Sequence, residues 1–108
     1  MPFLMYNSPI QKGGRPISGG HFNDNGYVYY KVAQFADELE HEISNNHVKN
    51  EWGYTPNHTR EVIEYLKEQI PKMRKMAEIM RACDYLYSGD YGDDSFMERV
   101  NQINEDYD

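Results

Sequence analysis

The chain has 108 residues, of which 39% are hydrophobic, with a formal net charge of −7 and a single cysteine. This length allows one domain with a modest core and excludes an enzyme with a separate cofactor domain. The negative charge argues against direct binding to nucleic acid, because proteins that bind the phosphate backbone present a basic face. Without a second cysteine, a secretion signal or an apolar run of membrane length, we expect a cytoplasmic protein with no membrane partner.

Residues 1–26 contain three prolines and five glycines without a helical period, so we expect an extended arm, followed by a helical body over 27–108. One stretch of this arm combines glycines with two basic side chains. Glycine amides beside positive charge can enclose an anion such as a phosphate, although a flexible loop is the favoured interpretation. The alternative ligand site consists of Lys12, Gly13, Gly14 and Arg15.

The first helical pattern covers about residues 29–45, where apolar side chains recur three or four positions apart as far as Ile43. The pair Asn45-Asn46 is expected to end this helix. A short strand at 27–31 is the main alternative, because the sequence Gly-Tyr-Val-Tyr-Tyr favours β-structure.

A connector of about residues 47–58 follows, interrupted by Gly53 and Pro56. Two large aromatic residues lie inside it, Trp52 and Tyr54. We expect their rings to cover the end of a helix pair.

The longest helical pattern, over about residues 59–87, is the strongest signal in the chain. Its apolar residues alternate spacings of three and four, which is typical of a helix that packs lengthwise against another helix. Pro71 lies inside this segment, where proline costs about 3 kcal/mol unless the helix bends. We therefore expect a kink, or two consecutive helices, near Pro71. The apolar seam consists of Ile63, Leu66, Ile70, Met73, Ala77 and Met80.

A turn with three aspartates leads into a last helix of about residues 95–105, where Ser95 and Glu98 have the spacing of a capping box. The aspartates do not fit the spacing of a calcium-binding EF-hand loop, and the histidines lack the spacing of a zinc site. No nucleophile with a positioned base is recognisable either. We expect no metal, no cofactor and no catalytic residue.

The most site-like cluster combines tyrosines with acidic residues around the end of the long helix. Such a mixture can imitate the spaced negative charge and flat faces of nucleic acid, so its expected partner is a basic or nucleic-acid-handling protein. For the acidic blocks themselves, solvated faces are the favoured alternative. The candidate partner-binding residues are Tyr85, Tyr87, Asp90, Tyr91, Asp93 and Asp94, with Glu38 and Glu42 from an earlier acidic block.

The sequence Cys-Asp-Tyr-Leu-Tyr-Ser-Gly-Asp-Tyr-Gly-Asp-Asp-Ser-Phe at residues 83–96 resembles a loose group of small phage and prophage accessory proteins. In those proteins a helix ends in an aromatic-Leu-x-Ser-Gly-Asp-x-Gly-x-x-Ser-Phe turn and continues into a final helix. The resemblance covers about residues 50–100 and implies a bacteriophage origin and a bacterial cytoplasm. Such proteins often bind a host factor stoichiometrically, and some inhibit CRISPR or other defence systems.

These patterns together predict an all-α fold. Helices 29–45 and 59–87 form a hairpin, helix 95–105 closes one end, and the arm 1–26 lies along the side. We expect a homodimer, because the seam and the many aromatic residues exceed what one hairpin can bury. The expected function is non-enzymatic inhibition or modulation of a host protein, as in an anti-CRISPR. A nucleotide- or phosphate-binding sponge and a self-assembling structural protein are the alternatives.

Overall fold

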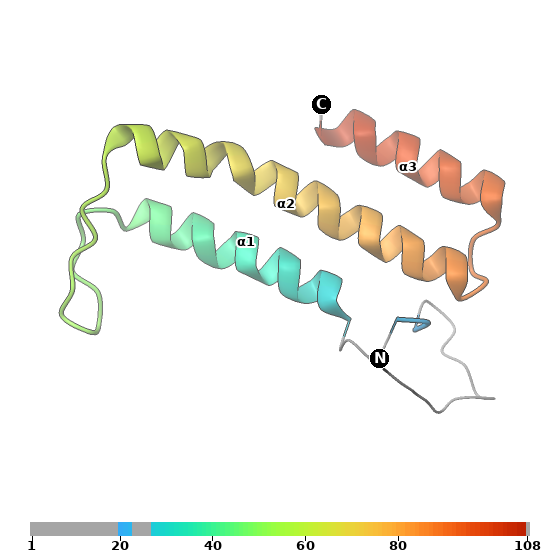
Figure 1. Cartoon of the computed structure of the whole chain (residues 1–108), viewed down its shortest axis with the longest axis horizontal. Helices are drawn as coiled ribbons and strands as arrows, with labels where there is room; N and C mark the ends of the chain where they lie inside the picture. Colours follow the sequence, from blue (N-terminus) through green and yellow to red (C-terminus); the bar gives the residue numbers. More distant parts are fainter. Residues whose placement is uncertain (1–19, 23–26, 108) are drawn as a thin grey trace.

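The computed structural model describes residues 20–22 and 27–107 and contains three helices in this part of the chain. They are α1 (Val28–Ser44), α2 (Arg60–Tyr87) and α3 (Asp93–Tyr107). Helices α1 and α2 form an antiparallel hairpin, and α3 runs back along the other side of α2 (Figure 1). The predicted all-α hairpin with a short C-terminal helix is confirmed. The alternative strand at 27–31 is wrong, because the helix already begins at Val28.

Small and apolar side chains hold α1 against α2. Ala36 on α1 and Ala77 on α2 are buried, and small side chains at a helix contact allow the two axes to approach closely. All six residues of the predicted seam are buried or half-buried. The apolar stripe of α2 therefore finds a partner in a helix of the same chain.

One arginine adds polar contacts across the hairpin. The Nη2 atom of Arg74 on α2 lies 2.9 Å from Oδ1 of Asp37 and 2.8 Å from Oε1 of Glu40, both on α1. Hydrogen bonds to Glu40 and Asp37 raise the pKa of Arg74 above its ordinary value. The two carboxylates are largely exposed, so solvent weakens these pairs, and they contribute less to stability than the apolar contact.

Helix α2 passes Pro71 as one element of 28 residues, so the alternative of two consecutive helices is wrong. Pro71 is exposed, and the ribbon changes direction in its yellow part (Figure 1). The helix is capped at its start, since the hydroxyl of Thr59 accepts a hydrogen bond from the amide of Val62 at 3.3 Å.

Helix α3 begins at Asp93, two residues before the predicted start. The predicted capping box is wrong, because the hydroxyl of Ser95 accepts the amide hydrogen of Gly92 at 3.0 Å. Ser95 therefore lies inside the first turn of α3 and is not its N-cap residue. Asp93 and Asp94 occupy that turn, where their negative charge is favourable beside the positive end of the helix dipole.

Candidate functional site

The connector between α1 and α2 contains a hydrogen-bonded turn that displays Trp52. Oδ1 of Asn50 accepts hydrogen bonds from the amides of Trp52 at 2.9 Å and Tyr54 at 3.0 Å. The amide of Asn50 donates to the carbonyl of Tyr54 at 2.8 Å. Gly53 has a φ of 84°, in the left-handed region where glycine carries no steric cost. The turn therefore satisfies its own backbone.

The base of the connector is tied together in the same way. The side-chain amide of Asn46 donates to the carbonyl of His58 at 3.1 Å, and the amide of His58 donates back to Oδ1 of Asn46 at 3.0 Å. The amide of His47 donates to the carbonyl of Pro56 at 2.7 Å. These bonds hold the two sides of the connector at a fixed separation.

An apolar depression of about 320 Å³ lies where this connector meets the helices. Beside it Trp52 is 84% exposed and Tyr54 is 60% exposed. The expectation that Trp52 and Tyr54 cover the end of the helix pair is wrong for Trp52, because its side chain is almost fully exposed, whereas Tyr54 lines the depression. We call Trp52 and the lining of the depression the hairpin-end surface. Its lining includes Leu39, Glu42, Ile43, Tyr54, Ile63 and Leu66.

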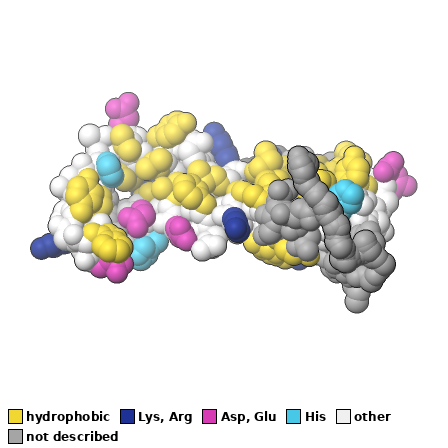
Figure 2. Space-filling view, turned by 60° about the horizontal axis from the view of Figure 1, so that its bottom comes forward, with side chains coloured by type: hydrophobic (Ala, Val, Ile, Leu, Met, Phe, Trp, Pro, Cys, Tyr) yellow, Lys and Arg dark blue, Asp and Glu magenta, His cyan; other side chains and the backbone are white. Residues whose placement is uncertain are grey.

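The hairpin-end surface is acidic as well as apolar. Residues 38–66 contain six Asp or Glu side chains and two Lys or Arg side chains, a formal charge of −4. Glu42 lines the apolar depression and also a neighbouring hollow of about 310 Å³ that includes Trp52. Hydrophobic and acidic side chains lie next to each other at this end of the molecule, on the left of Figure 2.

The structure brings together only part of the predicted tyrosine and aspartate cluster. The rings of Tyr85 and Tyr91 meet edge to face with their centroids 5.3 Å apart. Tyr87 packs instead beside His21 and Phe22. The centroid of its ring lies 5.7 Å from that of His21 and 6.0 Å from that of Phe22. The side chains of Asp90, Asp93 and Asp94 are exposed.

The two acidic blocks named from the sequence lie apart. Glu42 adjoins the connector at one end of the hairpin, and Glu38 is one turn away on α1. The turn 88–92 follows the opposite end of α2 (Figure 1). A single small contact surface therefore does not include both blocks.

A buried carboxylate that the sequence analysis did not single out organises the far end of α2. Asp84 has no exposed surface. Its oxygens accept hydrogen bonds from the amides of Gly20 at 2.9 Å and Phe22 at 3.1 Å, and from the hydroxyls of Tyr29 at 2.8 Å and Ser88 at 3.3 Å. Asp84 thereby attaches residues 20–22 of the N-terminal arm to both helices of the hairpin.

Burial and the hydrogen bond to Asp84 raise the pKa of Tyr29 above its ordinary value of 10.0. Burial also raises the pKa of Tyr27, with a smaller effect from the charge of Asp84. Both phenols stay protonated at neutral pH. The remaining arm residues fall outside the described part of the chain, including the alternative ligand residues Lys12, Gly13, Gly14 and Arg15.

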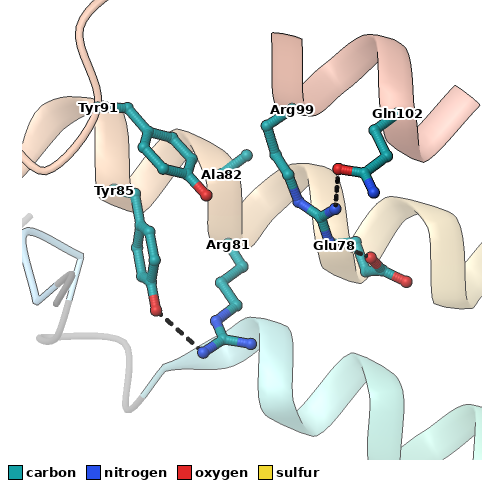
Figure 3. A pocket seen from close by; sticks show the side chains of 7 residues that line it. All are labelled: Glu78, Arg81, Ala82, Tyr85, Tyr91, Arg99 and Gln102. Carbon is teal, nitrogen blue, oxygen red and sulfur yellow. Dashed lines mark hydrogen bonds and ion pairs between the residues drawn. The ribbon is translucent and has the colours of Figure 1, made fainter. Parts of the chain in front are cut away.

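A second polar group joins α2 to α3. Oε1 of Glu78 accepts a hydrogen bond from Nη2 of Arg99 at 2.7 Å, and its other oxygen accepts one from the hydroxyl of Tyr107. This bond and burial raise the pKa of Tyr107. Beside these residues, a cleft of about 460 Å³ opens between the two helices (Figure 3).

No family model matches the chain, and neither a curated protein nor a solved structure matches it at a significant level. Among residues 20–22 and 27–107, no group of three His, Cys, Asp or Glu side chains is arranged to hold a metal ion. In the same part of the chain, no helix combines the length and apolar character needed to cross a membrane.

Proposed function

We propose that this chain is a non-enzymatic accessory protein that binds another protein through the hairpin-end surface and so inhibits or modulates it. The observation that carries the proposal is the position of Trp52, which is exposed on a hydrogen-bonded turn beside an apolar depression. Tryptophan and tyrosine are enriched among the residues that contribute most to protein–protein binding. A rigid turn also reduces the conformational entropy that such a contact loses on binding.

The charge of this surface indicates the chemistry of the partner. Because residues 38–66 carry a formal charge of −4, the partner should present lysine or arginine around an apolar side chain that enters the depression. Basic surfaces of this kind occur on nucleic-acid-handling proteins. Together with the resemblance to phage accessory proteins, this supports a bacterial host protein as partner, in the cytoplasm, and a role as a defence inhibitor such as an anti-CRISPR.

The acidic turn at the other end of α2 is the alternative surface for the same function. Its exposed carboxylates are those of Asp90, Asp93 and Asp94. Mimicry of nucleic acid would use this turn, where three acids lie within five residues. A partner that binds there would be insensitive to changes at Trp52, which distinguishes the two surfaces.

The test begins with a partner captured by the tagged chain from bacterial lysate at low salt and then purified. Its affinity is measured for the wild type and for Trp52→Ala. Loss of a central aromatic contact is expected to weaken binding by about thirtyfold or more, corresponding to about 2 kcal/mol. The matched control is Phe35→Ala on α1, where an aromatic ring is also exposed and the apolar depression does not include it.

Equal affinity of Trp52→Ala and the wild type would reject the hairpin-end surface. Loss of binding in the triple variant Asp90→Asn, Asp93→Asn and Asp94→Asn, with Trp52→Ala unaffected, would assign the partner to the acidic turn instead. Circular dichroism of each variant checks that the helices are retained.

A further inference from the structure

The cleft between α2 and α3 carries positive charge in a chain that is otherwise acidic. Its lining consists of Glu78, Arg81, Ala82, Tyr85, Tyr91, Arg99 and Gln102. Two arginines thus face one glutamate, whereas the whole chain has a net charge of −7. The volume of about 460 Å³ lies within the range of small-molecule sites, which is roughly 300–1,000 Å³.

The two arginines differ in how their guanidinium groups are used. Arg99 is held by Glu78 at 2.7 Å and by Oε1 of Gln102 at 3.2 Å. Arg81 forms no ion pair with any residue in the described part of the chain, and its hydrogen bond goes to the hydroxyl of Tyr85 at 2.9 Å. A guanidinium has five N–H donors, so most of those on Arg81 remain available to a ligand.

Aromatic rings hold Arg81 in place. Its Cζ atom lies 5.3 Å from the centroid of the Tyr85 ring and 5.8 Å from that of Tyr30, distances typical of cation–π contacts. A cation that is positioned in advance loses less side-chain freedom when an anion binds. In Figure 3 the ring of Tyr91 lies next to Tyr85, whose hydroxyl accepts the hydrogen bond from Arg81, so Tyr91 extends the aromatic lining of the cleft.

We propose that the α2–α3 cleft binds a small phosphate ester that carries a flat ring, which is the chemistry of a nucleotide. The phosphate binds the free N–H groups of Arg81, because a planar guanidinium matches the oxygens of a phosphate in a two-bond geometry. The ring lies against Tyr91, and Arg99 adds positive charge from the opposite wall. This site is independent of the hairpin-end surface and differs from the glycine-rich arm suggested by the sequence.

The test measures binding of adenosine monophosphate, adenosine and inorganic phosphate to the full chain by calorimetry and by NMR. Adenosine monophosphate should bind and should shift the ring signals of Tyr85 and Tyr91, whereas adenosine should bind at least about tenfold more weakly. Arg81→Gln should weaken nucleotide binding by about tenfold or more, because it removes charge-assisted hydrogen bonds. Arg60→Gln, which changes an exposed arginine at the other end of α2, should leave binding unchanged.

Three results would overturn the proposal: no binding of the nucleotide at millimolar concentration, equal binding of nucleotide and nucleoside, or equal losses in Arg81→Gln and Arg60→Gln. Binding of inorganic phosphate as tightly as the nucleotide would overturn the role of the ring. If Arg81→Gln does not fold, the comparison of nucleotide with nucleoside on the wild type still decides the question.

Discussion

The side chain on which the far end of the hairpin depends most is Asp84. A carboxylate without exposed surface is tolerated only where donors replace its lost water, and Asp84 receives two amides and two hydroxyls. Its role is structural: it joins the segment Gly20–Phe22, the start of α1 and the end of α2.

Replacing this acceptor should therefore be costly. Asp84→Ala leaves the amides of Gly20 and Phe22 and the hydroxyl of Tyr29 without their partner, and we expect the free energy of unfolding to fall by about 2–4 kcal/mol. Urea denaturation followed by circular dichroism measures this change. Asp106→Asn, an exposed acid on α3, is the control and should change stability by less than about 0.5 kcal/mol. Equal effects of the two substitutions would contradict a central role for Asp84.

Tyr29 predicts a dependence of stability on alkaline pH. Its folded pKa is raised above the ordinary value of 10.0, so the fold favours the protonated phenol. The stabilisation is complete below pH 10 and is lost as the pH rises from there toward the folded pKa, with a slope of up to about 1.4 kcal/mol per pH unit for this one group. Unfolding in urea at a series of alkaline pH values tests this. Tyr29→Phe should flatten the fall, whereas Tyr65→Phe on an exposed face of α2 should retain it.

Asp84 also shows what the sequence could have predicted at this scale. The seam spacing of three and four continues beyond Met80 to Asp84 and then Tyr87, so a charged residue occupies a position where the pattern requires an apolar one. A charged residue at such a position indicates a buried polar group. Its hydrogen-bond partners could not be predicted, because the amides of Gly20 and Phe22 come from a segment without periodicity, more than 60 positions earlier in the chain.

Among the elements, the helices were the most predictable, because hydrophobic periodicity over many turns reflects the face that each helix buries. The bounds of α1 and α2 differ from the predicted ones by a single residue at most. The predicted start of α3 was wrong because a serine such as Ser95 can be the N-cap residue or can lie in the first turn and accept a hydrogen bond from a preceding amide. The local sequence does not decide between the two. The exposure of Trp52 was missed because it depends on the hydrogen bonds of Asn50 rather than on hydropathy.

Replacing Pro71 tests how much the interior proline of α2 lowers the stability of the protein. An interior proline removes one backbone hydrogen bond, and here the residue is exposed, so burial of its ring offsets little of that loss. We expect Pro71→Ala to raise the free energy of unfolding by about 1–3 kcal/mol. Lys72→Ala, at the neighbouring exposed position, is the control and should have little effect. A decrease in stability with Pro71→Ala would show that the bend itself is needed for packing against α1 or α3.

At the scale of the whole molecule, the two surfaces proposed for binding differ in character and lie near the two ends of the hairpin. The connector end is apolar and acidic, whereas the α2–α3 cleft near the other end is lined by arginine and tyrosine. The seam is a weaker argument for the predicted dimer than the sequence suggests, because α1 of the same chain already packs against it. A second stripe of apolar residues on α2 is exposed and is available for a dimer contact. It consists of Val62, Tyr65, Met76 and Tyr87 on α2.

This stripe makes the homodimer testable. Tyr65, Met76 and Tyr87 are spaced 11 residues apart, which is close to three helical turns, so they share one face along most of α2. We expect light scattering to give a mass near twice 12.8 kDa, and Met76→Glu to return it toward the monomer, because a buried unpaired charge is unfavourable. Met97→Glu on α3 is a matched control, since both methionines are 52% exposed and only Met76 lies on the stripe. A wild-type mass of 12.8 kDa at high concentration would reject the dimer.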